Sequence, residues 1–179
     1  MVFIDGVIGV FSWRMEMHTV YLCIGGNLGD RLANLEETLD FITFNMGEIE
    51  ATSSIYESVP WGMQSTDNFL NQIVRIQTEL TPLQLLEEIK ELEEYYGRER
   101  KPGQYLSREM DVDVLFWNDE VIELEELAIP HPRLEVRRFV LLPMNELAPD
   151  FVHPVSNKKI SELLGACQDE SKVTLYASV

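Results

Sequence analysis

Two aspartates, Asp111 and Asp113, are the residues whose type and spacing most clearly suggest chemistry. They lie two positions apart in the apolar run formed by residues 110–117. Side chains alternate between the faces of a strand, so both carboxylates would point to the same side. Two neighbouring negative charges repel each other, and Mg²⁺ is often held by one or two carboxylates together with substrate phosphates. The pair therefore predicts a divalent-metal site.

The same aspartates could instead be solvent-facing residues of an edge strand. Two features favour the metal site: aspartate is depleted in strands, and a cluster of arginines is adjacent. The shared face is also expected to carry Leu115 and Trp117, so it is not simply a solvated polar face.

Basic residues gather just before the aspartates. Residues 97–101 read GRERK, Arg108 follows, and seven of the 14 Lys and Arg residues fall between Arg98 and Arg138. Residues 98–109 could be only a solvated loop. However, arginine outnumbers lysine, its guanidinium matches phosphate oxygens in two-point contacts, and long loops are often functional. Carboxylates for a metal beside guanidiniums for phosphate are typical of a phosphoryl-transfer site.

The composition limits the class of protein. The chain has 179 residues, 45% hydrophobic and 25% charged, which predicts one soluble globular domain with its own core. A net charge of -17 argues against nucleic acids and anionic membranes as partners. The local basic cluster instead predicts a small, highly charged anion as ligand. Cys23 and Cys167 lack the spacing of a zinc site, so we expect reduced thiols in a cytoplasmic protein.

The first 16 residues are largely apolar but do not match a targeting signal. Asp5 stands where a signal peptide needs basic residues, and no small-residue cleavage site follows. The run is also too short to span a bilayer. We expect residues 1–16 to be a non-catalytic N-terminal extension and residues 17–179 to form a single domain.

Hydrophobic periodicity predicts the elements that position these residues. Strands are expected at 19–25, 49–57, 69–79 and 110–117, and helices at 28–46 and 81–97. Thr81, Pro82 and Gln84 form a strong helix start. The order β-α-β-β-α-β predicts a ferredoxin-like α+β fold, an antiparallel sheet with helices packed on one face and the other face free for a site.

The rest of the chain should add smaller elements. A short strand is expected around residues 121–122, a helix from residue 134 up to Pro143, a short helix at 158–165 and a strand at 172–177. Residues 25–30, GGNLGD, lack the spacing of a dinucleotide or phosphate loop and favour a tight turn with a helix cap.

Three further features have two interpretations each. His131, between two prolines, is either a rigid turn or an anion contact next to nearby arginines. Phe69 and Asn71 share a strand face, and an aromatic plane beside an amide suits a flat heterocycle. Phe69, Trp61 and Phe139 could equally be core residues, and periodicity does not separate these alternatives.

Together these segments resemble the 6-hydroxymethyl-7,8-dihydropterin pyrophosphokinase family of folate biosynthesis. The resemblance covers residues 19 to about 154 in the stretches IGGNLGDR, SSIYESVPWG, NFLNQIV, ELEEYYGRER, SREMDVDVL and IPHPRLEVRRFVLLPMNELAP. The last three are the most specific. The resemblance implies a ferredoxin-like fold and transfer of the β,γ-diphosphate of ATP to the pterin hydroxymethyl group, with release of AMP.

The resemblance also implies roles for matching residues. Asp111 and Asp113 would hold two Mg²⁺ ions between ATP and the pterin hydroxyl, and Arg98 and Arg108 would act on the phosphates. The remaining implied nucleotide contacts are Glu93, Arg100, Val114, His131 and Arg137. The implied pterin contacts are Ser58, Val59, Pro60, Trp61, Phe69, Asn71, Asp111 and Phe139. The partners would be ATP and the pterin, and the chain a monomer or weak homodimer.

The chain departs from the family pattern just before Arg108. Tyr105, Leu106 and Ser107 stand where an aromatic–Gly–Pro segment is common, and Gln104 where arginine is frequent.

Two rival functions also fit the residues. One is a non-catalytic ligand-sensing module, since ferredoxin-like folds also serve regulation; the other is a two-metal phosphohydrolase. The sensing module gives no reason for paired strand carboxylates that face an arginine loop. A heterocycle pocket formed by Phe69, Asn71 and Phe139 beside the metals would favour transfer over hydrolysis.

Overall fold

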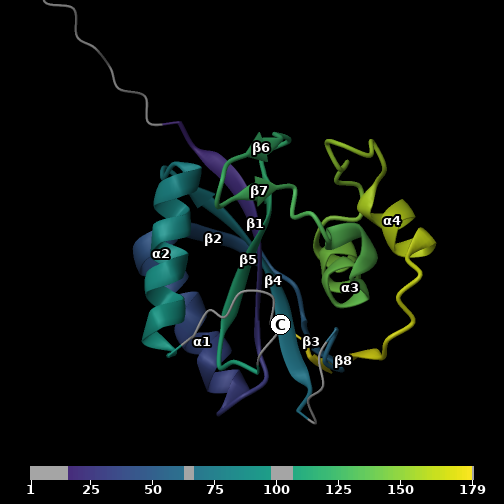
Figure 1. The fold of residues 1–179 in the computed structure, drawn as a ribbon, viewed down its shortest axis with the longest axis horizontal. Helices are drawn as coiled ribbons and strands as arrows, with labels where there is room; N and C mark the ends of the chain where they lie inside the picture. The colour runs from purple at the N-terminus through teal and green to yellow at the C-terminus, as the bar shows by residue number, and fades with distance from the viewer. Residues whose placement is uncertain (1–15, 63–66, 98–106, 179) are drawn as a thin grey trace, which may run out of the picture.

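The computed structural model describes residues 16–62, 67–97 and 107–178. An antiparallel sheet forms its centre (Figure 1). Its strands are β1 (His18–Gly26), β2 (Glu48–Thr52), β3 (Ile55–Ser58), β4 (Phe69–Thr78), β5 (Asp111–Trp117) and β8 (Val173–Ala177). The order is β5-β1-β4-β3-β8, and β2 also pairs with β4. A separate ribbon joins β6 (Ile122–Glu123) and β7 (Ala128–Ile129).

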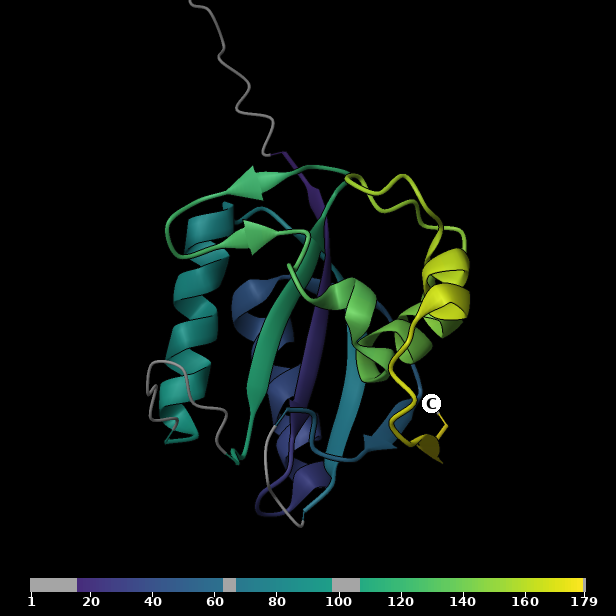
Figure 2. The ribbon, with the colours of Figure 1, turned by 45° about the vertical axis from the view of Figure 1, so that its right-hand side comes forward.

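Helices cover both faces of the sheet (Figures 1 and 2). On one face lie α1 (Arg31–Phe41), continued by a π-helical turn (Ile42–Met46), and α2 (Pro82–Tyr95). Against the other lie α3 (Arg138–Leu147), preceded by a 3₁₀ turn (Leu134–Val136), and α4 (Ile160–Ala166). None of the helices in the described part of the chain is both long and apolar enough to cross a lipid bilayer.

The β1 strand explains why both faces are covered. Leu22 and Ile24 belong to the core under α1 and α2, whereas Tyr21 and Cys23 belong to the core under α3 and α4. A strand with apolar side chains on both faces must be covered by other elements on both sides. The predicted ferredoxin-like α+β fold is confirmed, but the second face is not left free, because α3 and α4 cover part of it.

A bulge between β1 and β5 changes the expected alternation. The pairing shifts between Tyr21 and Leu22, so that Leu22 lies opposite Val114 and Tyr21 opposite Phe116. Leu115 therefore stays on the α3 face, but Trp117 packs in the core under α1 and α2. The prediction that Trp117 shares the aspartate face was wrong, since one extra residue reverses the side-chain parity.

Other element boundaries differ from the predictions in local ways. The strand expected at 49–57 is divided at Ser53, whose hydroxyl accepts a hydrogen bond from the Ile73 backbone N–H at 2.9 Å. The α3 helix continues through Pro143, because Leu141 and Met144 on either side of it pack into the core. The predicted Thr81–Gln84 capping box is present.

Candidate active site

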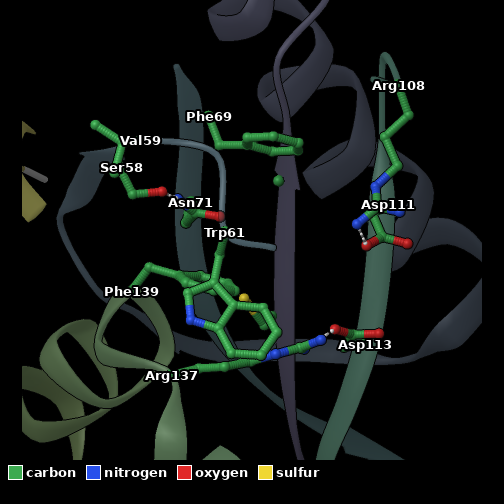
Figure 3. Close-up of a pocket in the computed structure, with 12 residues that line it drawn as sticks. Ser58, Val59, Trp61, Phe69, Asn71, Arg108, Asp111, Asp113, Arg137 and Phe139 are labelled. Atoms are coloured by element: carbon green, nitrogen blue, oxygen red, sulfur yellow. Dashed lines mark hydrogen bonds and ion pairs between the residues drawn. The ribbon is translucent and has the colours of Figure 1, made fainter. Parts of the chain in front are cut away.

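A pocket opens on the sheet face that carries α3, beside the segment that follows β3 (Figure 3). Its empty space, with the open mouth included, is about 530 Å³. The lining residues come from strands, α3 and connecting segments: Cys23, Gly25, Ser58, Val59, Trp61, Phe69, Asn71, Arg108, Asp111, Asp113, Arg137 and Phe139. Most of the residues predicted from the sequence are thus brought together, although Pro60 is not among the lining residues.

The two aspartates point into this pocket from β5 and each meets an arginine (Figure 3). One Asp111 carboxylate oxygen lies 2.5 Å from a terminal nitrogen of Arg108, and one Asp113 oxygen lies 3.1 Å from Arg137. The predicted shared face is confirmed, since Asp111 and Asp113 pair with Gly25 and Cys23 of β1. The arginine charges partly balance two carboxylates that would otherwise repel each other.

The charge balance at Asp113 favours a bound cation. Burial, and then the negative charge of Asp111, raise the pKa of Asp113, and the neighbouring side chains of His131, Arg137 and Arg108 oppose this only in part. No group of three or more His, Cys, Asp or Glu side chains in the described residues is placed to hold a metal ion. Two carboxylates fit Mg²⁺ that completes its shell with substrate phosphates and water.

His131 is held in a defined orientation beside Asp113. Its backbone N–H donates to the Leu115 carbonyl at 3.0 Å, and its Nδ1 accepts from the Arg133 backbone N–H at 3.1 Å. The proton of the neutral ring therefore lies on Nε2, 3.8 Å from an Asp113 oxygen. Burial lowers the pKa of His131, although Asp113 opposes the shift. A neutral ring offers Nε2–H as a hydrogen-bond donor.

A second hollow lies between α2 and the β6–β7 ribbon. Its lining combines apolar side chains with four carboxylates and a histidine: Leu86, Ile89, Glu93, Val112, Asp113, Val114, Leu124, Glu125, Glu126, Leu127, Ala128, His131 and Pro132. The predicted nucleotide contacts Glu93, Val114 and His131 are all here. Glu93 is buried, and its carboxylate accepts from the Val112 backbone N–H at 3.4 Å. Asp113 lines both cavities, so it stands at their junction.

The nucleotide residues predicted from the sequence do not all lie in this hollow. Arg108 and Arg137 line the first pocket instead. Arg98 and Arg100, with Lys101, Gln104, Tyr105 and Leu106, lie outside the described residues, and so do residues 1–15.

The first pocket has the features of a heterocycle site. Phe69 and Phe139 line it, and the Asn71 amide donates to the Ser58 hydroxyl at 2.9 Å while only 3% of Asn71 is exposed. Gly25 keeps the floor open, since an added Cβ would lie 2.6 Å from the Leu70 carbonyl oxygen and 2.9 Å from Asn71 Oδ1. Ser58 thus orients a buried amide at the edge of an aromatic pocket.

Arginines lie over the aromatic rings of this pocket. The Arg137 guanidinium is 5.2 Å from the Trp61 ring centre and 5.6 Å from that of Phe139, and Arg108 is 5.8 Å from Phe69. These distances allow cation–π attraction. Arg137 therefore links the aromatic wall to Asp113, a position that the sequence had not indicated.

Two further contributors were also missed. Cys23 lines the pocket as a buried thiol whose pKa is strongly raised by burial and then by the Asp113 and Asp111 charges, so it stays protonated. Asn27 was interpreted only as part of a turn. Its side-chain oxygen accepts from the Arg108 backbone N–H at 2.9 Å, and its own N–H donates to the Arg108 carbonyl at 2.9 Å. The turn thus fixes the backbone of Arg108.

The fold and site define a class of protein: an α+β domain in which paired strand carboxylates stand between a heterocycle pocket and a second ligand-sized hollow. The family model described as 7,8-dihydro-6-hydroxymethylpterin-pyrophosphokinase (HPPK) matches residues 21–149. The chain belongs to this family. The resemblance drawn from its motifs is confirmed, and the chain is a diphosphotransferase of folate biosynthesis with ATP as co-substrate.

Individual relatives agree with the family match. The chain is 39% identical over 146 residues to the 2-amino-4-hydroxy-6-hydroxymethyldihydropteridine pyrophosphokinase of Aquifex aeolicus, covering 82% of this chain and 90% of the relative. It is 35% identical over 160 residues to the protein of the same name from Haemophilus influenzae, covering 89% and 99%. The Plasmodium falciparum HPPK-DHPS crystal structure matches with a TM-score of 0.70 at 20% identity, over 84% of this chain and 44% of that one. This last match shows the fold alone.

Proposed function

We propose that this chain binds 6-hydroxymethyl-7,8-dihydropterin in the pocket lined by Phe69 and Phe139, and ATP in the hollow between α2 and the β6–β7 ribbon. The reaction transfers the β,γ-diphosphate to the pterin hydroxymethyl group and releases AMP. The observation that carries this assignment is the position of Asp113, which lines both cavities. The diphosphate transferred from ATP to the pterin would therefore pass the Asp113 carboxylate.

Asp111 and Asp113 are the residues that would hold metal, and we propose two Mg²⁺ ions. Bound there, the ions would neutralise phosphate charge and lower the pKa of the attacking hydroxyl. The chain itself supplies positioning and charge, because phosphoryl transfer needs little covalent help from the protein. No residue is assigned as a general base.

The arginines and His131 are proposed to act on the phosphates. Arg108 and Arg137 already lie against the two carboxylates, at the place where phosphate negative charge would gather. His131 presents Nε2–H on the nucleotide side of Asp113. Arg98 and Arg100 are assigned to the phosphates and nucleotide by the family pattern alone.

The pterin is proposed to lie between the rings of Phe69 and Phe139, with Asn71 reading its edge. Ser58, Val59, Pro60 and Trp61 form the segment above it. An amide held by Ser58 presents a fixed hydrogen-bonding group to a flat ligand. This arrangement distinguishes the transferase from a phosphohydrolase, which has no need of such a pocket.

Incubation with ATP, Mg²⁺ and 6-hydroxymethyl-7,8-dihydropterin tests the proposal. We expect AMP to form only when the pterin is present. ADP or phosphate released without pterin would favour the phosphohydrolase, and nucleotide binding with no turnover would favour the sensing module.

Asn71→Leu tests the pterin pocket. The variant keeps most of the side-chain volume but removes a buried hydrogen-bonding group, so we expect the KM for pterin to rise roughly 10- to 100-fold. The KM for ATP should change less than about twofold, because Asn71 does not line the nucleotide hollow. Steady-state kinetics with each substrate varied in turn measures both values.

Gln77→Leu is the matched control, an amide at the other end of β4 that donates to the Thr19 hydroxyl. If Asn71→Leu changed neither KM, or changed both equally, the assignment of this pocket to the pterin would be wrong.

We also propose that the chain acts in the cytoplasm as a monomer or weak homodimer without nucleic-acid or membrane partners. Its net charge of -17 and two free cysteines support this. Residues 17–179 are proposed as one catalytic domain and residues 1–16 as a non-catalytic extension. Size-exclusion chromatography with light scattering, and activity of a variant lacking residues 1–16, test these points.

A further inference from the structure

The segment that follows α4 runs to the edge of the sheet, where it forms β8 (Figure 2). Its strand β8 pairs with β3, placing Val173 opposite Ser58, and the Lys172 carbonyl accepts from the Val59 backbone N–H at 3.4 Å. Before that strand, one Asp169 carboxylate oxygen accepts from the Arg138 backbone N–H at 3.0 Å. This segment lies beyond residues 21–149, which the family model matches.

The hydrogen bond from the Arg138 backbone N–H to Asp169 caps the N-terminus of α3. The first N–H groups of a helix have no partner within it, and Arg137, at the cap position, makes no side-chain capping hydrogen bond. Asp169 supplies the missing acceptor from a distant part of the sequence. Its negative charge is also favourable at the positive end of a helix.

Asp169 is itself held in place. Its other carboxylate oxygen accepts from the Ser171 backbone N–H at 3.0 Å and from the Ser171 hydroxyl at 2.5 Å. Burial alone would raise the pKa of Asp169, but hydrogen bonds from Ser171 and the Arg138 N–H hold it below the usual value. The group is therefore an ionised acceptor at neutral pH.

The residues on either side of Arg138 are pocket residues. Arg137 is only 5% exposed, lies 3.1 Å from Asp113 and stacks with Trp61, while Phe139 forms one aromatic wall. We propose that Asp169 is a positioning residue for the pterin pocket, because it fixes the turn from which Arg137 and Phe139 project. This inference rests on the proposed function, which assigns the pterin to this pocket.

Loss of the contact should lower pterin affinity selectively. Without its cap, the first turn of α3 adopts the conformation that binds pterin only part of the time. The apparent Kd for pterin then rises by the inverse of the fraction of molecules in that conformation. From the usual effect of removing a helix cap, we expect the pterin Kd of Asp169→Ala to rise roughly three- to thirtyfold. No residue of α3 lines the nucleotide hollow, whereas Arg137 and Phe139 both line the pterin pocket, so the Kd for ATP should rise less than the Kd for pterin.

The experiment combines hydrogen exchange with calorimetric binding. In the wild-type protein the Arg138 amide should exchange slowly; in Asp169→Ala it should exchange faster and pterin should bind more weakly. Asp169→Asn keeps one side-chain oxygen and should give an intermediate pterin Kd. Asp150→Ala is the matched control, since Asp150 is 82% exposed and pairs with Lys159; it should match the wild type.

The outcomes separate the two claims. Unchanged pterin affinity in Asp169→Ala, or an equal loss of pterin and ATP affinity, overturns the positioning role while leaving the proposed function intact. Failure of the wild-type protein to bind pterin, with the Arg138 amide still protected, contradicts the proposed function and removes the basis of this proposal. If Asp169→Ala does not fold, Ser171→Ala gives the same test, because it removes only the hydroxyl that orients Asp169.

Discussion

Replacing Asp113 with asparagine should lower kcat by roughly 10²- to 10³-fold or more, the scale of losing a group that stabilises transition-state charge. Asparagine keeps the size of the side chain but removes the charge that would hold metal at the junction of the two cavities. Asp113→Ala should abolish transfer. Product formation at saturating ATP, Mg²⁺ and pterin measures the effect.

Asp113→Asn should not destabilise the metal-free protein. Burial and the Asp111 charge raise the folded-state pKa of Asp113 above its unfolded value. The ionised group therefore lowers stability as pH rises through the folded-state pKa. Asparagine stays neutral, so at neutral pH the free energy of unfolding of Asp113→Asn should equal or exceed that of the wild type in a denaturant titration.

Asp150→Asn, on an exposed surface, is the control for Asp113→Asn. A folded Asp113→Asn protein that retained full Mg²⁺-dependent turnover would show that the carboxylate holds no essential metal. A large loss of stability would show instead that its pairing with Arg137 outweighs burial and repulsion.

Arg108→Ala should lower kcat roughly 10²-fold while the KM for ATP changes less than about threefold. In this structure the guanidinium contacts Asp111 and lies over Phe69, and Arg108 does not line the nucleotide hollow. It can therefore add little to ATP binding in the ground state. The positive charge of Arg108 becomes important in the transition state, when negative charge builds up on the phosphates during transfer. Initial-rate kinetics with varied ATP separates the two parameters.

Arg108→Lys keeps the charge but loses the planar two-point geometry, and should be intermediate. Arg75→Ala is the matched control, since Arg75 pairs with Glu50 at 3.0 Å and lines neither cavity. The assigned role is wrong if Arg108→Ala leaves kcat intact, or if its loss is entirely in the KM for ATP.

The aspartate pair shows what the sequence could predict. A strand period of two was enough to place Asp111 and Asp113 on one face, and that placement is correct. The same rule failed for Trp117, four residues later, because the bulge depends on how β1 and β5 pair rather than on the residues of β5 alone. Local patterns hold only as far as the register holds.

Tertiary contacts account for the other differences. Three features depend on segments that are distant in sequence: the position of Asp113 between the two cavities, the stacking of Arg137 with Trp61, and the cap that Asp169 gives to α3. No spacing rule identifies such contacts from one chain. The family resemblance implied that Arg137 contacts the nucleotide, and the structure places its side chain in the first pocket, against the ring of Trp61.

We propose above all that Asp111 and Asp113 together hold metal between the pterin and the nucleotide. Mn²⁺ binding measured by electron paramagnetic resonance, with a non-hydrolysable ATP analogue and pterin present, tests it most directly. We expect two tightly bound ions in the wild-type protein, and loss of at least one in both Asp111→Asn and Asp113→Asn. Wild-type stoichiometry and affinity in the Asp111→Asn/Asp113→Asn double variant would contradict the claim.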